Sequence, residues 1–199
     1  MGDPSAELLT DLYEFTMAAA LVAEGKADLP SVFSLYIRRL PPSRGFLVAA
    51  GLDDVLRFLD DLHFTAEDVA ALERLFPFDR TFLGWLAAVR FTGRVRAVPE
   101  GRIVFAGEPL LEIEAPFAVA QLLETYLLNQ VTVSTTLATK AARCRHAAQG
   151  RLLVDFALRR THGSDAGMKA ARCAALVGFA GTSNVAAADR YGIPASGTM

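Results

Sequence analysis

The sequence predicts an α/β protein, in which an N-terminal α/β domain is followed by the first strands and helices of a parallel array. Three observations predict this class. Apolar residues recur at helical spacing along most of the first half of the chain. A compact β-rich block, residues 91–117, interrupts that pattern, and short strands alternate with helices after residue 150. Such alternation with short connections is typical of a parallel sheet or barrel.

The N-terminal elements follow from spacing and residue type. Apolar periodicity predicts a helix over residues 6–24, with Thr10 and Asp11 placed to cap its start. β-branched and aromatic residues predict a strand over residues 32–40. Three amphipathic helices are then expected at residues 50–63, 66–76 and 79–90, with Thr65 opening the second.

The central part changes character twice. Glycine and proline punctuate short alternating stretches in residues 91–117, which is typical of a run of β-strands. A long helix is expected over residues 118–148. Its centre is rich in threonine and valine, which have low helix propensity, so a break is predicted near residues 131–136.

The C-terminal part predicts parallel strands joined by helices. Strands are expected at residues 151–156, 178–181 and 193–199, with helices at 164–178 and 184–192 between them. Ser164 or Asp165 is expected to cap the first of these helices. Three strands do not close a (β/α) barrel, which needs about eight. The sequence is therefore expected to be the front end of a larger protein.

Composition excludes several classes of protein. Hydrophobic residues make up 52% of the chain and charged residues 21%, which argues against intrinsic disorder. A net charge of −2 argues against a protein that coats nucleic acid. The sequence shows neither a signal peptide nor an apolar run that could span a membrane, so a cytoplasmic location is expected. Cys144 and Cys173 are expected to be reduced, buried thiols, and no metal-ligating residue is assigned.

Chemistry in parallel α/β folds collects at the carboxyl ends of strands. The three predicted strands deliver there an arginine pair, an aromatic ring, hydroxyls and small residues: Asp155, Phe156, Arg159, Arg160; Thr182, Ser183, Asn184; and Ser196, Gly197, Thr198. Arginine and an aromatic face suit an anionic ligand with a flat ring. The alternative interpretation is that these residues are helix caps and turns.

Several segments, in order, resemble nicotinate phosphoribosyltransferase. They are LLTDLYEFTMA at 8–18, PEGRIVFAGEPLLEIEAP at 99–116, LLETYLLN at 122–129, ATKAAR at 138–143, DFALRRTHG at 155–163 and GFAGTSNVAAADRYGIPASGT at 178–198. The resemblance extends over almost the whole chain. It implies an N-terminal α/β domain at 1–130 and, at 131–199, the incomplete start of the irregular α/β barrel of type II phosphoribosyltransferases.

The resemblance also implies a reaction. Members of this family join nicotinate to phosphoribosyl pyrophosphate, which gives nicotinate mononucleotide and pyrophosphate, with Mg²⁺ and with ATP hydrolysis coupled through a phosphohistidine. That histidine is expected just beyond Met199, because the chain stops two positions short of it. The chain alone is therefore expected to be incomplete as an enzyme. A homodimer with a shared active site in the cytoplasm is implied.

Roles carry over to four main positions. Tyr13 would stack on the pyridine ring across a dimer interface, and Phe156 would stack on the ring's other face. Arg159 would bind the nicotinate carboxylate or the product phosphate, with Arg160 as the alternative. Ser183 stands where relatives that use nicotinamide carry an acidic residue. A serine there would not repel the carboxylate of nicotinate, so it favours the acid over the amide.

Further substrate contacts are expected from Asn184 and from Thr198. Weaker phosphate contacts are expected from basic residues in a loop and on the long helix, namely Arg38, Arg39, Arg44 and Lys140. A solvated charged surface is an equal interpretation of these four.

Three alternatives remain open. The first is an inactive fragment or interaction module of the same family. The second is a phosphoribosyltransferase that acts on quinolinate. The third is a biotinyl or lipoyl carrier, which residues 98–117 resemble in pattern. A carrier needs a lysine as the attachment point, and the sequence has none between residues 27 and 139.

Overall fold

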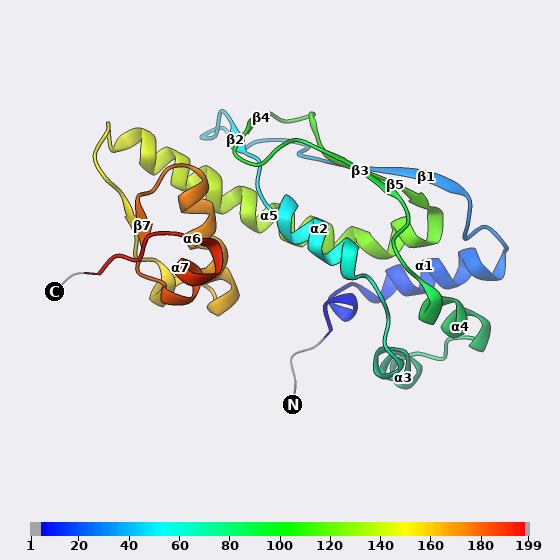
Figure 1. Ribbon diagram of the computed structural model, residues 1–199. Helices are drawn as coiled ribbons and strands as arrows, with labels where there is room; N and C mark the ends of the chain where they lie inside the picture. Colours follow the sequence, from blue (N-terminus) through cyan, green and yellow to red (C-terminus); the bar gives the residue numbers. More distant parts are fainter. Residues whose placement is uncertain (1–4, 198–199) are drawn as a thin grey trace. The chain divides into compact units, whose positions relative to one another are not determined.

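The computed structural model describes residues 5–197 (Figure 1). Its contacts divide the chain into two compact units. Neither unit is continuous in sequence. Unit 1 contains residues 1–35, 53–97 and 111–129, and unit 2 contains residues 36–52, 98–110 and 130–199. The domain division at residue 130 that the resemblance implies stays a prediction.

Unit 1 combines helices with a three-stranded sheet. Its helices are η1 (Ala6–Leu8), α1 (Leu12–Ala23), α2 (Leu52–Asp61), α3 (Ala66–Leu75), α4 (Arg80–Ala88) and the first part of α5 (Phe117–Ala147). The sheet has the order β1-β5-β3, formed by β1 (Pro30–Tyr36), β5 (Pro109–Pro116) and β3 (Arg94–Ala97). Strands β3 and β5 are antiparallel, in a register that places Arg94 opposite Glu114 and Arg96 opposite Glu112.

Aromatic side chains form much of the core of unit 1. Phe15, on α1, meets Phe64 and Phe78 edge to face, with ring centroids 6.0 Å and 6.4 Å away. Phe82 extends the cluster from Phe78, with the centroids 5.1 Å apart. Burying a large side chain contributes about 1.5–3 kcal/mol relative to leaving it exposed, so this cluster fixes α1 and α4 against each other.

Unit 2 contains the remaining elements. They are β2 (Leu47–Val48), β4 (Ile103–Val104), the second part of α5, β6 (Val154–Asp155), η2 (Leu158–Arg160), α6 (Ser164–Leu176), β7 (Gly181–Thr182) and α7 (Val185–Tyr191). Strands β2 and β4 pair antiparallel, and β6 and β7 pair parallel. Helix α6 lies beside α7 in Figure 1 and contacts it.

The predicted break in the long helix is wrong, because α5 is continuous from Phe117 to Ala147. Two threonines in this part of the helix, Thr135 and Thr139, are buried and form hydrogen bonds. The Thr135 hydroxyl accepts from the Ala50 amide at 3.3 Å, and the Thr139 hydroxyl accepts from the Val48 amide at 2.9 Å. These threonines therefore satisfy the backbone around β2, and that tertiary benefit outweighs their low helix propensity.

Gly51 shows how closely this region packs. Its φ is +98°, a left-handed conformation that favours glycine. A Cβ there would lie 2.7 Å from the carbonyl oxygen of Gln130. The chain can therefore pass over α5 only because residue 51 has no side chain.

Helix starts follow the prediction in one place and differ in two. Thr65 opens α3 with a capping box, in which its hydroxyl accepts from the Asp68 amide and the Asp68 carboxylate accepts from the Thr65 amide. Asp11 is the N-cap residue of α1 but makes no capping bond with its side chain. Neither Ser164 nor Asp165 caps α6, because Gly163 takes the N-cap position with φ +94°.

The structure also tests the expectations for the cysteines and for membrane-spanning helices. Cys173 is buried, but Cys144 is exposed on the last turns of α5, so the expectation of two buried thiols is wrong for Cys144. Within residues 5–197, no helix is both long enough and apolar enough to cross a membrane.

Candidate substrate site at the ends of the parallel strands

The carboxyl ends of three parallel segments meet in unit 2. Strands β6 and β7 pair Val154 with Gly181 and Asp155 with Thr182. Ala195 then forms a parallel bridge to Thr182, so the segment that follows α7 joins the same edge. This is the strand–helix–strand order that the sequence predicts, although each strand is only about two residues long. The site-bearing segments therefore lie side by side.

Close approach at this edge requires a glycine. A Cβ at Gly181 would lie 2.7 Å from the Pro194 carbonyl oxygen and 3.0 Å from the Ser196 hydroxyl. In the adjacent backbone hydrogen bonds, the Thr182 amide donates to the Pro194 carbonyl at 3.0 Å, and the Ser196 amide donates to the Thr182 carbonyl at 2.9 Å. The absence of a side chain at residue 181 thus allows the third segment to pair.

Two candidate site residues follow these strands directly. Phe156 comes after β6 and is 41% exposed, which leaves part of its ring free to contact a ligand. Ser183 comes after β7, is half-buried, and donates from its amide to the Asp155 carbonyl at 2.8 Å. The pairing of β6 with β7 therefore brings an aromatic residue and a serine to one edge, as the sequence predicts. Their contact with substrate stays a prediction.

The two candidate arginines lie on the short helix η2. Arg159 and Arg160 are both exposed, and the loop from Asp155 that leads to them is only a few residues long. Helix α6 packs closely behind η2, because a Cβ at Gly167 would lie 2.5 Å from the Leu158 side chain. The scaffold thus holds the arginine pair in place with the guanidinium groups accessible to an anion.

Asn184 caps the start of helix α7. It is buried, its side-chain oxygen accepts from the Ala187 amide at 3.2 Å, and its side-chain nitrogen lies 3.5 Å from the Met168 sulfur. These bonds make it the N-cap of α7. Its role in binding substrate stays a prediction.

The remaining predicted residues of unit 2 lie elsewhere on its surface. Arg38 and Arg39 are exposed and Arg44 is half-buried, all in the segment between β1 and β2, while Lys140 is exposed on α5. Thr198 lies outside the described residues.

Tyr13 belongs to unit 1 and is part of a polar network that joins α1 to α5. The residue is 44% exposed, and its hydroxyl donates to a Glu124 carboxylate oxygen at 3.3 Å. Partial desolvation and the neighbouring carboxylates of Glu14 and Glu124 raise the pKa of Tyr13 above its ordinary value. The tyrosine is therefore neutral and held at its hydroxyl end, with much of the ring exposed.

Glu14 is the centre of this network. It is fully buried, accepts from the Gln121 side chain at 2.5 Å and from the Thr125 hydroxyl at 3.1 Å. Burial raises the pKa of Glu14, although these hydrogen bonds act in the opposite direction. Sequence reasoning missed this role, and the available signal is the glutamate that interrupts the apolar periodicity of α1.

A second polar anchor, also missed by sequence reasoning, lies in unit 2. The Glu100 carboxylate forms a two-point pair with Arg172, at 2.6 Å and 3.1 Å, and accepts from the amides of Gly51 and Leu52. Burial acts to raise the pKa of Glu100, but Arg172 and the two amides outweigh it and hold the pKa below its ordinary value. The pair connects α6, which supports η2, to the residues around β2.

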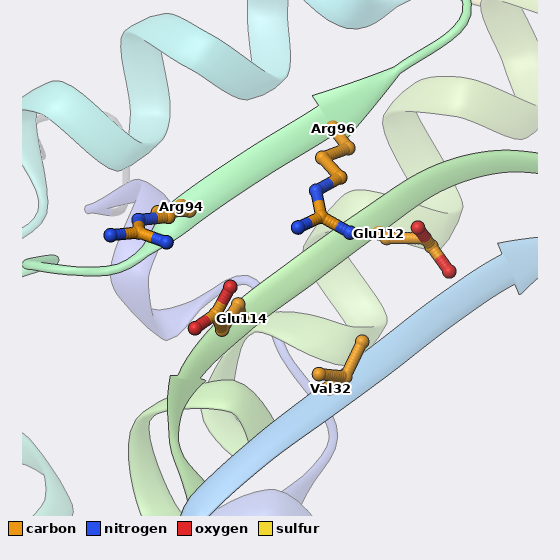
Figure 2. Close-up of a pocket in the computed structure, with 5 residues that line it drawn as sticks. All are labelled: Val32, Arg94, Arg96, Glu112 and Glu114. Carbon is orange, nitrogen blue, oxygen red and sulfur yellow. The ribbon is translucent and has the colours of Figure 1, made fainter.

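A shallow pocket lies on the sheet of unit 1, lined by Val32, Arg94, Arg96, Glu112 and Glu114 (Figure 2). Its positive and negative side chains come from neighbouring strands and oppose one another in register. Opposite charges across a strand pair stabilise the sheet by about 0.2–1 kcal/mol each, so the lining is explained by sheet stability.

The structure gives no support for a metal site among residues 5–197. No three His, Cys, Asp or Glu side chains converge there in a way that could hold an ion. The Mg²⁺ that the resemblance implies stays a prediction.

Comparison with known proteins gives one family. The model of the nicotinate phosphoribosyltransferase (NAPRTase) N-terminal domain matches residues 8–132. Nicotinate phosphoribosyltransferase pncB2 of Mycobacterium tuberculosis is 51% identical over 192 residues, which cover 96% of this chain and 41% of the relative. Nicotinate phosphoribosyltransferase of Bacillus subtilis is 40% identical over 196 residues, which cover 98% of this chain and 40% of the relative.

Solved structures agree with these sequences. Human nicotinic acid phosphoribosyltransferase aligns with a TM-score of 0.89 and 41% identity, over 96% of this chain and 39% of the human chain. Nicotinate-nucleotide pyrophosphorylase from Pyrococcus furiosus aligns with a TM-score of 0.78 at 23% identity, which shows the shared fold alone. The chain spans about two fifths of the length of the relatives it matches.

Proposed function

Since the chain belongs to the nicotinate phosphoribosyltransferase family, we propose that the enzyme carrying it joins nicotinate to phosphoribosyl pyrophosphate, forming nicotinate mononucleotide and pyrophosphate in NAD biosynthesis. The observation that carries this proposal is the parallel strand edge of unit 2. There an exposed aromatic ring, an arginine pair and a serine follow two adjacent strand ends.

The chemistry of nicotinate fits these residues. Its flat ring suits the exposed face of Phe156, because aromatic stacking contributes about 0.5–1.5 kcal/mol beyond burial. Its carboxylate suits a guanidinium, and charge-assisted hydrogen bonds contribute about 1.5–3 kcal/mol each. Arg159 or Arg160 would supply that group. Ser183 adds a hydroxyl without a negative charge, which favours the acid over nicotinamide.

The wider features of the enzyme belong to the same proposal. Tyr13 would stack on the ring when supplied by the partner subunit of a homodimer. Arg38, Arg39, Arg44 and Lys140 would contact phosphates, and Asn184 and Thr198 would contact substrate. ATP coupling with Mg²⁺ and a cytoplasmic location are proposed on the family resemblance alone.

The deciding experiment is an assay of the enzyme with nicotinate, phosphoribosyl pyrophosphate, ATP and Mg²⁺. We expect formation of nicotinate mononucleotide and a strong preference for nicotinate over nicotinamide. Arg159→Lys keeps the charge and loses the planar fork, so turnover should fall. A wild-type enzyme that makes no nicotinate mononucleotide, or that consumes quinolinate instead, would overturn the proposed function.

The alternative of an inactive fragment concerns residues 1–199 expressed alone. We expect no formation of nicotinate mononucleotide from that polypeptide, because these residues span only about two fifths of the length of the relatives. Turnover at an ordinary enzymatic rate, about 1–10³ per second, would contradict this expectation.

A further inference from the structure

Asp155 is a buried carboxylate that the proposed reaction does not use. It is only 6% exposed, although it lies at the strand edge that carries the candidate site. One carboxylate oxygen accepts from the Ala157 amide at 3.0 Å, and the other accepts from the Thr182 hydroxyl at 2.8 Å. Both oxygens are therefore bonded to the protein itself.

Thr182 continues the chain of hydrogen bonds. It is fully buried, and its hydroxyl also accepts from the Asn184 amide at 3.0 Å. An amide can only donate, so the Thr182 hydroxyl accepts from Asn184 and donates its own proton to the Asp155 side chain. The three groups form a directed relay from the Asn184 amide through Thr182 to Asp155.

This relay encloses the two candidate residues for nicotinate. Phe156 lies between Asp155 and Ala157, and these two residues are joined by the hydrogen bond from the Ala157 amide to the Asp155 carboxylate. Ser183 lies between Thr182 and Asn184, which the hydroxyl joins, and its amide donates to the Asp155 carbonyl at 2.8 Å. One carboxylate thus fixes the backbone of both residues, one on each strand end.

We propose that Asp155 and Thr182 are positioning residues that set the placement of Phe156 and Ser183 for nicotinate. This inference rests on the proposed function, since it concerns the same site. Neither residue contacts substrate in this scheme. Their effect is selective, because the relay holds the part of the site proposed for nicotinate, and among residues 5–197 it makes no hydrogen bond to the basic loop at residues 37–46 that is proposed for phosphates.

The test is Thr182→Val in the enzyme that carries this chain. Valine keeps the shape and removes the hydroxyl, so the Asn184 amide and one oxygen of Asp155 lose their partner. We expect the KM for nicotinate to rise about five- to tenfold, as for the loss of a hydrogen bond, while the KM for phosphoribosyl pyrophosphate stays within about twofold. Thr182→Ser keeps the hydroxyl and should restore the wild-type KM for nicotinate.

Thr135→Val is the matched control. Thr135 is also a buried threonine of unit 2 bonded to backbone, but it joins α5 to Ala50, just after β2, and lies outside the relay. We expect it to lower the melting temperature without a selective change in the KM for nicotinate. Asp155→Asn provides a second variant if Thr182→Val does not fold, and the same selective rise is expected.

The results separate the two proposals. A wild-type enzyme without nicotinate-dependent turnover would reject the proposed function. An active wild-type enzyme whose Thr182→Val variant keeps its KM for nicotinate would reject the relay alone. Equal rises in the KM for both substrates, or a serine variant as impaired as the valine variant, would also reject it, since those results indicate a general structural role.

Discussion

The two aromatic residues proposed to face the pyridine ring are held in different ways. Tyr13, in unit 1, stands on the regular helix α1 and is fixed by side chains from α5 around the buried Glu14. Phe156, in unit 2, stands in a loop after a two-residue strand, and its neighbour Asp155 fixes that loop by accepting from the amides of Ala157 and Ser183. Regular secondary structure provides the geometry in the first region, and hydrogen bonds local to the strand ends provide it in the second.

The two units are therefore sensitive to different perturbations. The network of unit 1 contains a buried acid whose pKa burial raises, so its contribution depends on pH. The strand ends of unit 2 depend on α6 behind them, and α6 is anchored by the ion pair of Glu100 and Arg172. Unit 1 should therefore respond most to pH, and unit 2 to the loss of an anchor.

Removing the anchor of unit 2 should have the largest effect. Glu100→Ala leaves the guanidinium of Arg172 and the amides of Gly51 and Leu52 without their carboxylate. Removing one side of a largely buried pair weakens the compensation of the remaining charge, so we expect a loss of about 2–4 kcal/mol in the free energy of unfolding. Urea unfolding followed by circular dichroism measures it.

The matched control is an exposed pair of the same length in unit 1. Glu24 and Lys26 also lie 2.6 Å apart, but both side chains are more than half exposed. Glu24→Ala should leave the midpoint nearly unchanged, because water screens such a pair. Equal losses for the two variants would contradict the importance assigned to the anchor.

Placing a charge at the strand ends should have the next largest effect. Ser183→Asp puts a carboxylate beside the proposed position of the nicotinate carboxylate, so nicotinate binding should weaken by about 1–3 kcal/mol. Isothermal titration calorimetry measures this change. Asparagine has nearly the same size as aspartate but no charge, so Ser183→Asn should weaken binding less. Unchanged affinity in the aspartate variant would remove Ser183 from the site.

The pH dependence of unit 1 should change with Glu14→Gln. The pKa of Glu14 is raised in the folded state, so the native protein holds this proton more tightly than the unfolded chain. Stability must then fall as the pH rises from the unfolded pKa to the folded pKa. The glutamine variant cannot titrate, so it should lack this fall just above the ordinary pKa of 4.5. Urea unfolding between about pH 4 and pH 7 tests it.

Glu73→Gln, on the exposed side of α3, is the control for this series. A Glu14→Gln variant whose pH profile follows that of wild type would show that Glu14 does not titrate differently in the two states.

The smallest effect is expected for Tyr13→Phe. The bond from the Tyr13 hydroxyl to Glu124 is long, at 3.3 Å, and lies at the surface. Its loss should cost about 0.5 kcal/mol or less of stability, and the ring remains for stacking, so the KM for nicotinate should change by less than about twofold. Steady-state kinetics of Tyr13→Phe are compared with those of Tyr13→Ala, which removes the ring and should raise the KM for nicotinate. Equal kinetics for both variants would remove Tyr13 from the site.

Much of the fold was predictable from the sequence. The helices around residues 52–61, 66–75 and 80–88, the β-rich block and the parallel pairing after residue 150 all appear where spacing and residue type predict them. The strand edge with Phe156, Arg159 and Ser183 was predictable too, because parallel strands bring their carboxyl ends together. The break in α5 was predicted wrongly, because propensity does not include the bonds that Thr135 and Thr139 make to the segment around β2.

Periodicity and local motifs are enough to indicate the class of fold, the family and the order of the site-bearing segments. They do not indicate which polar groups meet across long separations in the folded chain. Glu14 bonds with Gln121, Glu100 with Arg172, and Asp155 with Thr182. A buried carboxylate is tolerated only where specific donors surround it, and those donors come from segments that no local pattern connects.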